Sequence, residues 1–78
     1  MKPWDASQTQ IKRWIREAAF MYWLHYSYRP WIDHMQLIQG WSEQDAAEFL
    51  KTHNRDIREA FKRLNTWLNA EDEGAATI

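Results

Sequence analysis

Three histidines are the side chains of this sequence best suited to chemistry near neutral pH, because an imidazole can bind a metal ion or carry a proton. They are His25, His34 and His53, and the chain contains no cysteine. None of them has a second histidine four residues further on, so no helix would present the paired ligands typical of a zinc site. We therefore expect no metal site and no cofactor.

The carboxylates form no catalytic pattern either. The sequence contains no glycine-rich phosphate loop, no nucleophile elbow and no His-Glu-x-x-His motif. Asp45, Asp56 and Glu59 instead fall where helices are expected to begin, and a carboxylate there stabilises the first backbone N–H groups. We expect a protein that is not an enzyme.

The composition favours one small helical domain. Within 78 residues there are six Trp, three Tyr and three Phe, but only two Gly and two Pro, which is too few turn-forming residues for a many-stranded sheet. The longest uncharged run, residues 18–28, is too short to span a bilayer. We expect an all-α protein that is cytoplasmic and has no membrane span.

The first predicted helix covers about residues 8–27 and begins after Ser7, which resembles the start of a capping box. Its inward stripe is Ile11, Trp14, Ile15, Ala18, Tyr22 and Tyr26. Phe20, Trp23 and Leu24 lie on the side away from that stripe. A domain of this size cannot cover both sides of such a helix, so part of the apolar surface is expected to meet another molecule.

Three shorter helices are predicted after Pro30, which suits the first turn of a helix. They cover about residues 31–39, 42–52 and 56–68. Gly40 and Asn54 are predicted to take left-handed conformations between them, while Ser42 and Asp56 cap the second and third. On the first of these helices, Ile32, Met35 and Ile38 fall on one side, and on the second the expected inward residues are Ala46, Phe49 and Leu50. The apolar residues at helical spacing on the third are Ile57, Ala60, Phe61, Leu64, Trp67 and Leu68. Residues 71–78 are predicted to form a mobile acidic tail.

The stretch from Gln39 to Leu64 resembles the ubiquitin-associated (UBA) family and the similar domains of the nascent-polypeptide-associated complex. The positions in register with that pattern are Gly40, Ser42, Ala46, Leu50, Asn54, Ile57, Ala60 and Leu64. The resemblance implies a UBA-like three-helix bundle over residues 31–70, and it also implies a ubiquitin-like protein as ligand. The aromatic helix predicted within residues 1–30 lies outside the family pattern, and we expect it to pack on this bundle.

Two positions depart from the ubiquitin-binding members of that family. Those members present a Met-Gly-Phe loop and a pair of leucines late in the third helix, whereas this chain has Gln39-Gly40-Trp41 and Leu64-Asn65. Replacing apolar anchors by amides weakens a contact whose energy comes mainly from buried anchors.

The function predicted from the sequence is non-catalytic protein binding. The expected contact residues are Phe20, Trp23, Leu24, Gln39, Gly40, Trp41, Leu64, Trp67 and Leu68, with Arg16, Arg29 and Arg63 at the rim. The partner could be a ubiquitin-like protein, a helical segment of a larger complex or a second copy of the chain.

Two other function classes stay open from the sequence. Arg55, Arg58, Lys62 and Arg63 make the last helix basic, which loosely resembles a DNA-binding helix-turn-helix, but Asp56 and Glu59 interrupt that surface and the net charge is −1. A nucleic acid partner is therefore not favoured. A small, aromatic-rich helical chain would also suit a phage-type inhibitor of a larger host enzyme.

Overall fold

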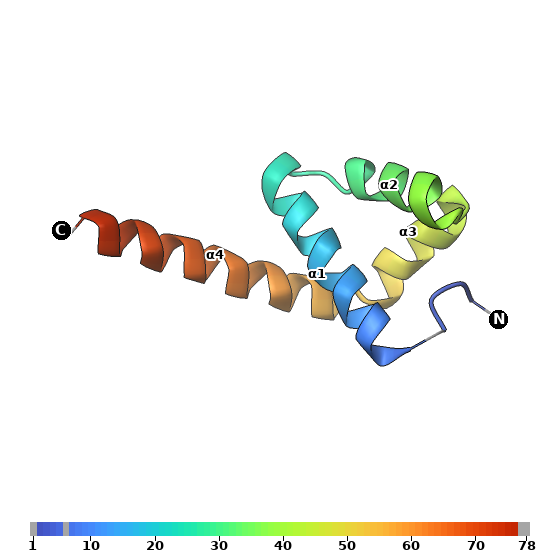
Figure 1. Ribbon diagram of the computed structural model, residues 1–78, viewed down its shortest axis with the longest axis horizontal. Helices are drawn as coiled ribbons and strands as arrows, with labels where there is room; N and C mark the ends of the chain where they lie inside the picture. The colour runs from blue at the N-terminus through green and yellow to red at the C-terminus, as the bar shows by residue number, and fades with distance from the viewer. Residues whose placement is uncertain (1, 6, 77–78) are drawn as a thin grey trace.

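Four α-helices and no β-strand make up the described part of the chain (Figure 1). The computed structural model describes the backbone of residues 2–5 and 7–76, and the side chains in these ranges as far as Leu68. The helices are α1 (Gln8–His25), α2 (Arg29–Gln39), α3 (Glu43–Thr52) and α4 (Asn54–Ala76). The predicted all-α class is confirmed.

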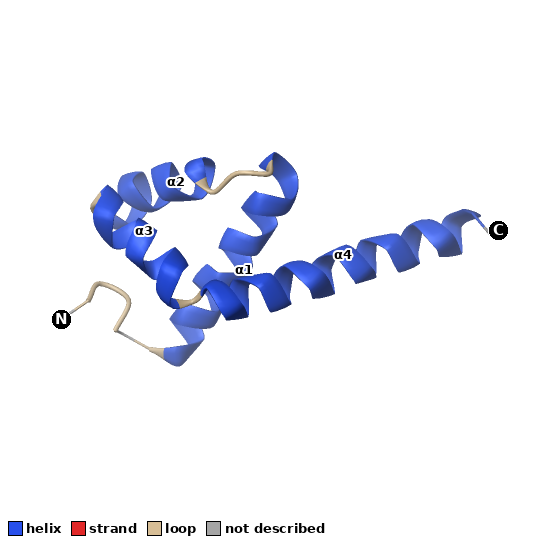
Figure 2. Ribbon diagram, turned by 180° about the vertical axis from the view of Figure 1, so that it is seen from behind, coloured by secondary structure: helices blue, strands red, loops and turns tan. Residues whose placement is uncertain are grey.

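The first helix lies at the centre of the arrangement. Both α2 and α4 pack against α1, and α3 packs against α2 and α4. The second half of α4 continues away from the other three helices, so that the molecule measures 51 × 22 × 18 Å (Figures 1 and 2). Two differently enclosed regions result: a bundle in which helices meet on several sides, and a projecting end.

An aromatic cluster around Phe49 fills the bundle. The ring of Phe49 has its centroid 5.4 Å from that of Trp31, 5.5 Å from that of Trp4 and 5.6 Å from that of Trp41. Trp14 meets Trp41 edge-on, with a centroid distance of 4.9 Å. The same core contains Ile15, Ala18, Ala19, Met35, Ala46 and Ile57. Residues before and after position 30 therefore share one core.

The segment before α1 adds a core tryptophan that periodicity cannot reveal. Residues 2–5 form a turn in which the backbone N–H of Asp5 donates to the carbonyl of Lys2, 3.1 Å away. Pro3 occupies the second position of this turn, where its fixed φ is favourable. The turn buries Trp4, and the Lys2 ammonium binds Glu48 of α3 at 2.6 Å.

Three of the predicted helix-end signals are present in the structure. Ser7 accepts from the backbone N–H of Gln10, and Ser42 accepts from that of Asp45, each at 3.1 Å. Gly40 ends α2 with a φ of 71°, in the left-handed region that glycine adopts at little cost. These side chains and this glycine satisfy backbone groups that the helix ends leave unpaired.

Other helix boundaries differ from the prediction. The left-handed residue that ends α1 is Tyr26, with a φ of 53°, so the helix stops at His25 and α2 begins at Arg29. Asn54 is the first residue of α4 and has no positive φ, and Asp56 lies in the first helical turn instead of capping it. The His53 carbonyl accepts from the N–H of Ile57 and so starts α4 earlier than predicted.

The last helix is also longer than predicted, since α4 runs past Leu68 to Ala76. The end of α4 overlaps the segment 71–78, which is predicted to be mobile. Residues 77 and 78 lie outside the described residues, and the mobility of this segment stays a prediction. In the described residues, no helix combines the length and the apolar character needed to cross a membrane.

Candidate protein-binding surface

The second half of α1 carries an apolar face that the bundle leaves open. Phe20 and Leu24 are each 47% exposed, and Trp23 is half-buried. Residues three and four apart lie on one side of a helix, which places these three side chains together. Ala18 and Ala19, in contrast, are buried against the rest of the bundle.

The projecting part of α4 carries a similar set at the same spacing. Trp67 is 61% exposed, and Leu64 and Leu68 are partly buried. Lys62, Arg63, Thr66 and Trp67 line a shallow hollow of about 370 Å³ on this helix. We call the six residues Phe20, Trp23, Leu24, Leu64, Trp67 and Leu68 the α1–α4 apolar surface.

A groove between α1 and α4 adjoins this surface. It has a volume of about 320 Å³ and is lined by Arg16, Ala19, Phe20, Ala60, Arg63 and Leu64. Its lining combines two small alanines and two apolar side chains with the positive charges of Arg16 and Arg63. The sequence prediction that Arg16, Phe20, Arg63 and Leu64 share a surface thus corresponds to one groove.

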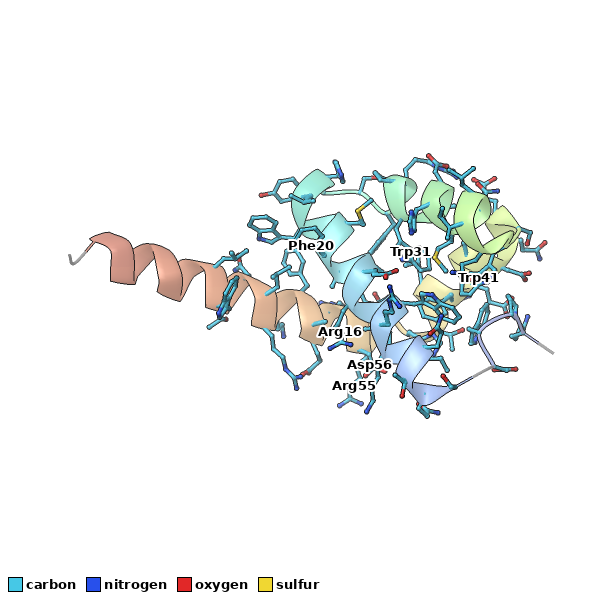
Figure 3. The ribbon with its side chains drawn as sticks, in the orientation of Figure 1. Arg16, Phe20, Trp31, Trp41, Arg55 and Asp56 are labelled. Atoms are coloured by element: carbon cyan, nitrogen blue, oxygen red, sulfur yellow. The ribbon has the colours of Figure 1, made fainter. Side chains whose placement is uncertain are left out.

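A second, more polar cleft continues the groove toward the start of both helices. Its volume is about 780 Å³, and its charged lining residues are Lys12, Arg16, Arg55, Asp56, Glu59 and Arg63. Arg16, Arg55 and Asp56 lie near the crossing of α1 and α4, with Phe20 farther along α1 (Figure 3). None of the four cations is in an ion pair with another described side chain. The cleft therefore favours an anionic group.

Three aromatic rings from α1, α4 and the α1–α2 connection pack together at the α1–α4 junction and line a further cleft of about 480 Å³. Tyr22 lies 4.6 Å from Tyr28 and 5.6 Å from Phe61, measured between ring centroids. Burial raises the pKa of the Tyr28 phenol above its ordinary value. The edge-on contact of Tyr22 with Phe61 joins α1 to α4.

Trp41 does not belong to the surface, which corrects the prediction that placed this loop aromatic among the contact residues. The left-handed Gly40 turns the chain back, and the Trp41 N–H donates to the Met35 carbonyl at 3.3 Å. The indole is consequently buried against Trp14, Trp31 and Phe49.

Arg29 is likewise not available as a rim residue. Its guanidinium binds Asp33 at 2.9 Å and also binds Glu43, and these contacts raise its pKa. The residue joins α2 to the start of α3 instead of orienting a partner. Helix propensity could not reveal this, because Glu43 is distant in sequence and reaches Arg29 only once the chain has turned at Gly40.

Gln39 and Gly40 are exposed, but they lie at the far end of α2, away from the projecting half of α4 (Figure 1). Their neighbours Leu37 and Ile38 are also exposed, the former by 82%. Tyr26 was predicted to point inward and does not, because α1 ends before it. Ile38 was predicted to share one side of α2 with Met35, but Met35 is buried and Ile38 is exposed. The predicted contact residues therefore fall at two separate places.

One of the three histidines packs against the core, and the other two are exposed. His53 stacks on Phe49 with a centroid distance of 4.2 Å, and its Nδ1 lies 3.1 Å from the Phe49 carbonyl oxygen. A carbonyl oxygen only accepts, so Nδ1 carries the proton in this contact. His25 and His34 are exposed. Over the described ranges, no three histidine or carboxylate side chains converge on a point where they could hold a metal ion.

Comparison of the chain with protein-family models, curated proteins and solved structures gives no match. The function has to be argued from the surface described above.

Proposed function

We propose that this chain is a non-catalytic protein-binding module that receives an amphipathic helix of a partner on the α1–α4 apolar surface. The observations that carry the proposal are the 61% exposure of Trp67 on the part of α4 that projects from the bundle, and the half-exposed Phe20 and Leu24 on α1. Phe20 and Leu64 line one groove, and Trp67 lines a hollow that shares Arg63 with it. Clusters of exposed apolar residues mark interaction sites, and tryptophan is among the residues that contribute most to binding energy.

The shape of the groove favours a helical ligand. A groove between two helices accepts the side chains that another helix presents at three-residue and four-residue spacing. Its rim is positive, because Arg16 and Arg63 have no ion-pair partner among the described side chains. The partner helix should therefore carry acidic residues beside its apolar anchors, which would fix its orientation.

The resemblance to UBA domains is kept as a narrower proposal for residues 31–70. It is supported by Gly40 and Ser42, which occupy the turn and cap positions of the family pattern with the backbone roles that pattern needs. Ubiquitin itself is a less favoured ligand than a helix, because Gln39 is polar and Trp41 is buried. Titration with monoubiquitin should leave the amide chemical shifts unchanged, and saturable shifts around residues 39–41 and 64–68 would reverse this preference.

The proposal is tested by affinity capture with the purified full chain as bait in a lysate of its native host. The test variants are Phe20→Ala and Trp67→Ala, and the matched control is Leu37→Ala, which truncates an exposed leucine at the other end of the molecule. A central anchor residue is worth about 2 kcal/mol, so each test variant should lower the affinity for the captured protein by about 30-fold. The control should bind as the unmodified chain does.

Circular dichroism accompanies each capture, to confirm that the variants keep their helicity. Equal capture by the unmodified chain and both test variants, with helicity intact, would contradict the proposal. A loss of capture confined to the Leu37→Ala variant would also contradict the proposal, because it would place the contact surface at the end of α2.

A further inference from the structure

The cleft of about 480 Å³ at the α1–α4 junction shares no lining residue with the groove or with the larger polar cleft. Its volume falls within the range of about 300–1,000 Å³ that is typical of small-molecule sites. Three aromatic side chains, two cations and one amide line it, and we call it the tyrosine cleft. Its lining residues are Tyr22, Tyr28, Phe61, Arg58, Lys62 and Asn54.

The aromatic part of the tyrosine cleft is a group of rings from three segments of the chain. The Tyr22 ring meets that of Tyr28 at an interplanar angle of 34° and that of Phe61 at 72°. All three side chains are only partly buried, and all three line the cleft. A planar ligand ring that enters the cleft can extend this packing, because aromatic rings attract one another in both offset-stacked and edge-to-face arrangements.

The polar part of the tyrosine cleft comes from one side of α4. Asn54, Arg58 and Lys62 follow one another at four-residue spacing and are all exposed. Neither cation is in an ion pair with another described side chain, and no carboxylate is among the described residues that line the cleft. The larger polar cleft, in contrast, contains Asp56 and Glu59 beside its cations. The tyrosine cleft therefore offers an anion two cations with no competing carboxylate in its lining.

The cations and the rings lie close enough to act on one ligand. Burial raises the pKa of the Tyr28 phenol, and the positive charge of Arg58 partly opposes this rise, which places the guanidinium near the ring. Phe61 directly precedes Lys62 in the same helix. A ligand that fills the cleft would therefore need a planar ring and a negative group within one small molecule.

A nucleotide has the parts that these residues would recognise. Its base is planar, and the edge of the base carries both donors and acceptors, as does the amide of Asn54. Its phosphate matches the charge of Arg58 and Lys62. Two cations suffice for one phosphate group, whereas the net charge of −1 on the chain disfavours a long polyanion.

We propose that the tyrosine cleft binds a mononucleotide, with the base against the aromatic rings and the phosphate at Arg58 and Lys62. This site is separate from the α1–α4 apolar surface, so the inference does not depend on the proposed function. Loss of nucleotide binding would leave the capture experiment with Phe20→Ala and Trp67→Ala unaffected, and the two proposals can fail independently.

The binding is measured by nuclear magnetic resonance on the isotope-labelled full chain, titrated in turn with AMP, GMP, CMP and UMP. We expect saturable shifts of residues in the tyrosine cleft with at least one of the four, at a Kd between about 0.1 and about 1 mM because the site is open. Nuclear Overhauser contacts should join base protons to the rings of Tyr28 or Phe61. Absence of shifts with all four nucleotides at about 5 mM would overturn the proposal.

Removal of either cation tests the phosphate part of the site. Arg58→Gln and Lys62→Gln should each weaken nucleotide binding at least about fivefold. The matched control is Arg55→Gln, which removes an exposed cation of the same helix that lines the other polar cleft. This control should bind as the unmodified chain does, and equal losses in all three variants would reduce the effect to net charge and overturn the assignment.

The ring of Tyr28 tests the aromatic part. Tyr28→Leu removes the ring and should weaken binding at least about fivefold, whereas Tyr28→Phe keeps the ring and should bind as the unmodified chain does. Circular dichroism checks that both variants remain helical. If Tyr28→Leu loses helicity, the Overhauser contacts in the unmodified chain decide, and their absence in a saturated complex would contradict the placement of the base.

Three further ligands separate a mononucleotide from its parts and from its polymer. Inorganic phosphate lacks the ring and phenyl phosphate lacks the edge of the base, so each should bind at least about fivefold more weakly than the best mononucleotide. Equal affinity for either one would reduce the cleft to a general anion site or a general aromatic phosphate site. A single-stranded oligoadenylate that binds at least about tenfold more tightly than AMP would assign the cleft to nucleic acid. Each of these results overturns the proposal.

Discussion

The tryptophans of this chain divide between two regions that treat the same side chain differently. Trp4, Trp14, Trp31 and Trp41 are buried around Phe49, whereas Trp23 is half-buried and Trp67 is largely exposed. In the first region the N-terminal turn and several helices converge, so each ring meets other rings. In the second region two helices diverge, and none of the ring–ring contacts found among the described residues involves Phe20, Trp23 or Trp67.

The comparison shows that residue type alone does not decide whether an aromatic side chain is core or surface. What decides is the number of elements that reach it. The space enclosed by the N-terminal turn and the helices α1, α2 and α3 is already filled by five aromatic side chains, namely Trp4, Trp14, Trp31, Trp41 and Phe49. Phe20, Trp23 and Trp67 lie outside that core, on α1 and α4, which is why we propose this end of the molecule as the binding site for a partner.

The two regions should differ most in the free energy of unfolding that is lost when an aromatic side chain is truncated, and the larger loss is expected in the core. Trp31 is fully buried, so Trp31→Ala should lower the free energy of unfolding by about 3–5 kcal/mol. A domain of 78 residues has only about 4–12 kcal/mol in total, so this variant should be mostly unfolded at modest urea concentrations. Urea titration followed by circular dichroism gives the value.

Trp31→Phe sharpens the same measurement. The indole N–H of Trp31 is buried and has no acceptor among the described residues, so a phenylalanine removes volume but no hydrogen bond. We expect it to cost clearly less than alanine does. Equal losses of unfolding free energy for both variants would mean that the indole N–H of Trp31 does make a stabilising hydrogen bond.

Truncation of the exposed ring should give the opposite result. Trp67→Ala should change the free energy of unfolding by no more than about 0.5 kcal/mol, because the side chain covers little of the core. The same urea titration provides the comparison with Trp31→Ala. A loss of several kcal/mol at position 67 would assign Trp67 to the core and remove the distinction between the two regions.

A smaller effect is expected at the turn that delivers Trp41 to the core. Gly40 has a φ of 71°, and a Cβ added there would meet no atom within 4 Å, so only backbone strain opposes a side chain. Gly40→Ala should therefore cost about 1–2 kcal/mol. Thermal unfolding checks this, with a fall in Tm of about 4–8 °C for each kcal/mol in a domain of this size. An unchanged Tm would show that the left-handed conformation is not needed to bury Trp41.

The smallest effect concerns Tyr28, whose ring packs against Tyr22 at the α1–α4 junction. Burial raises the pKa of its phenol in the folded state above the ordinary value of about 10, so the protonated form is favoured by folding. The corresponding stabilisation is complete below about pH 10 and is lost as the pH rises through the folded-state pKa.

Between about pH 8 and about pH 11, the Tm of the unmodified chain should thus fall further than that of Tyr28→Phe. Comparing the two proteins cancels the ion pairs that they share. These include the Lys2–Glu48 contact, which raises the pKa of Lys2 and is lost at high pH once the Lys2 ammonium loses its proton. Parallel losses in both proteins would contradict the assignment.

Local signals in the sequence predicted the fold better than they predicted the surface. Ser7, Ser42 and Gly40 act within a few residues of themselves, so their helix ends could be predicted from the residue types. Asn54 was predicted to be left-handed on the same reasoning, but α4 starts at this residue without such a turn, and the left-handed role belongs to the exposed Tyr26.

The residues that were misplaced depend on contacts distant in sequence. Trp41 is buried because the Gly40 turn carries it to Trp14, and Arg29 is occupied because the same turn brings Glu43 within reach. Trp4 precedes the first helix and has no periodic neighbours, so only the Pro3 turn indicates that the chain folds back. Exposure of Leu37 follows from how many helices cover α2, which no property of α2 alone determines.

Photo-cross-linking compares the two ends of the molecule in one experiment and tests the proposed contact surface most directly. Benzoylphenylalanine is introduced in place of Trp67 or, as the matched control, in place of Leu37, and each full-length chain is irradiated in a lysate of its native host. We expect a discrete protein adduct, with a second copy or with another protein, from position 67 and none from position 37. The absence of any adduct at position 67, or adducts of equal yield at both positions, would contradict the assignment of the α1–α4 apolar surface as the binding site.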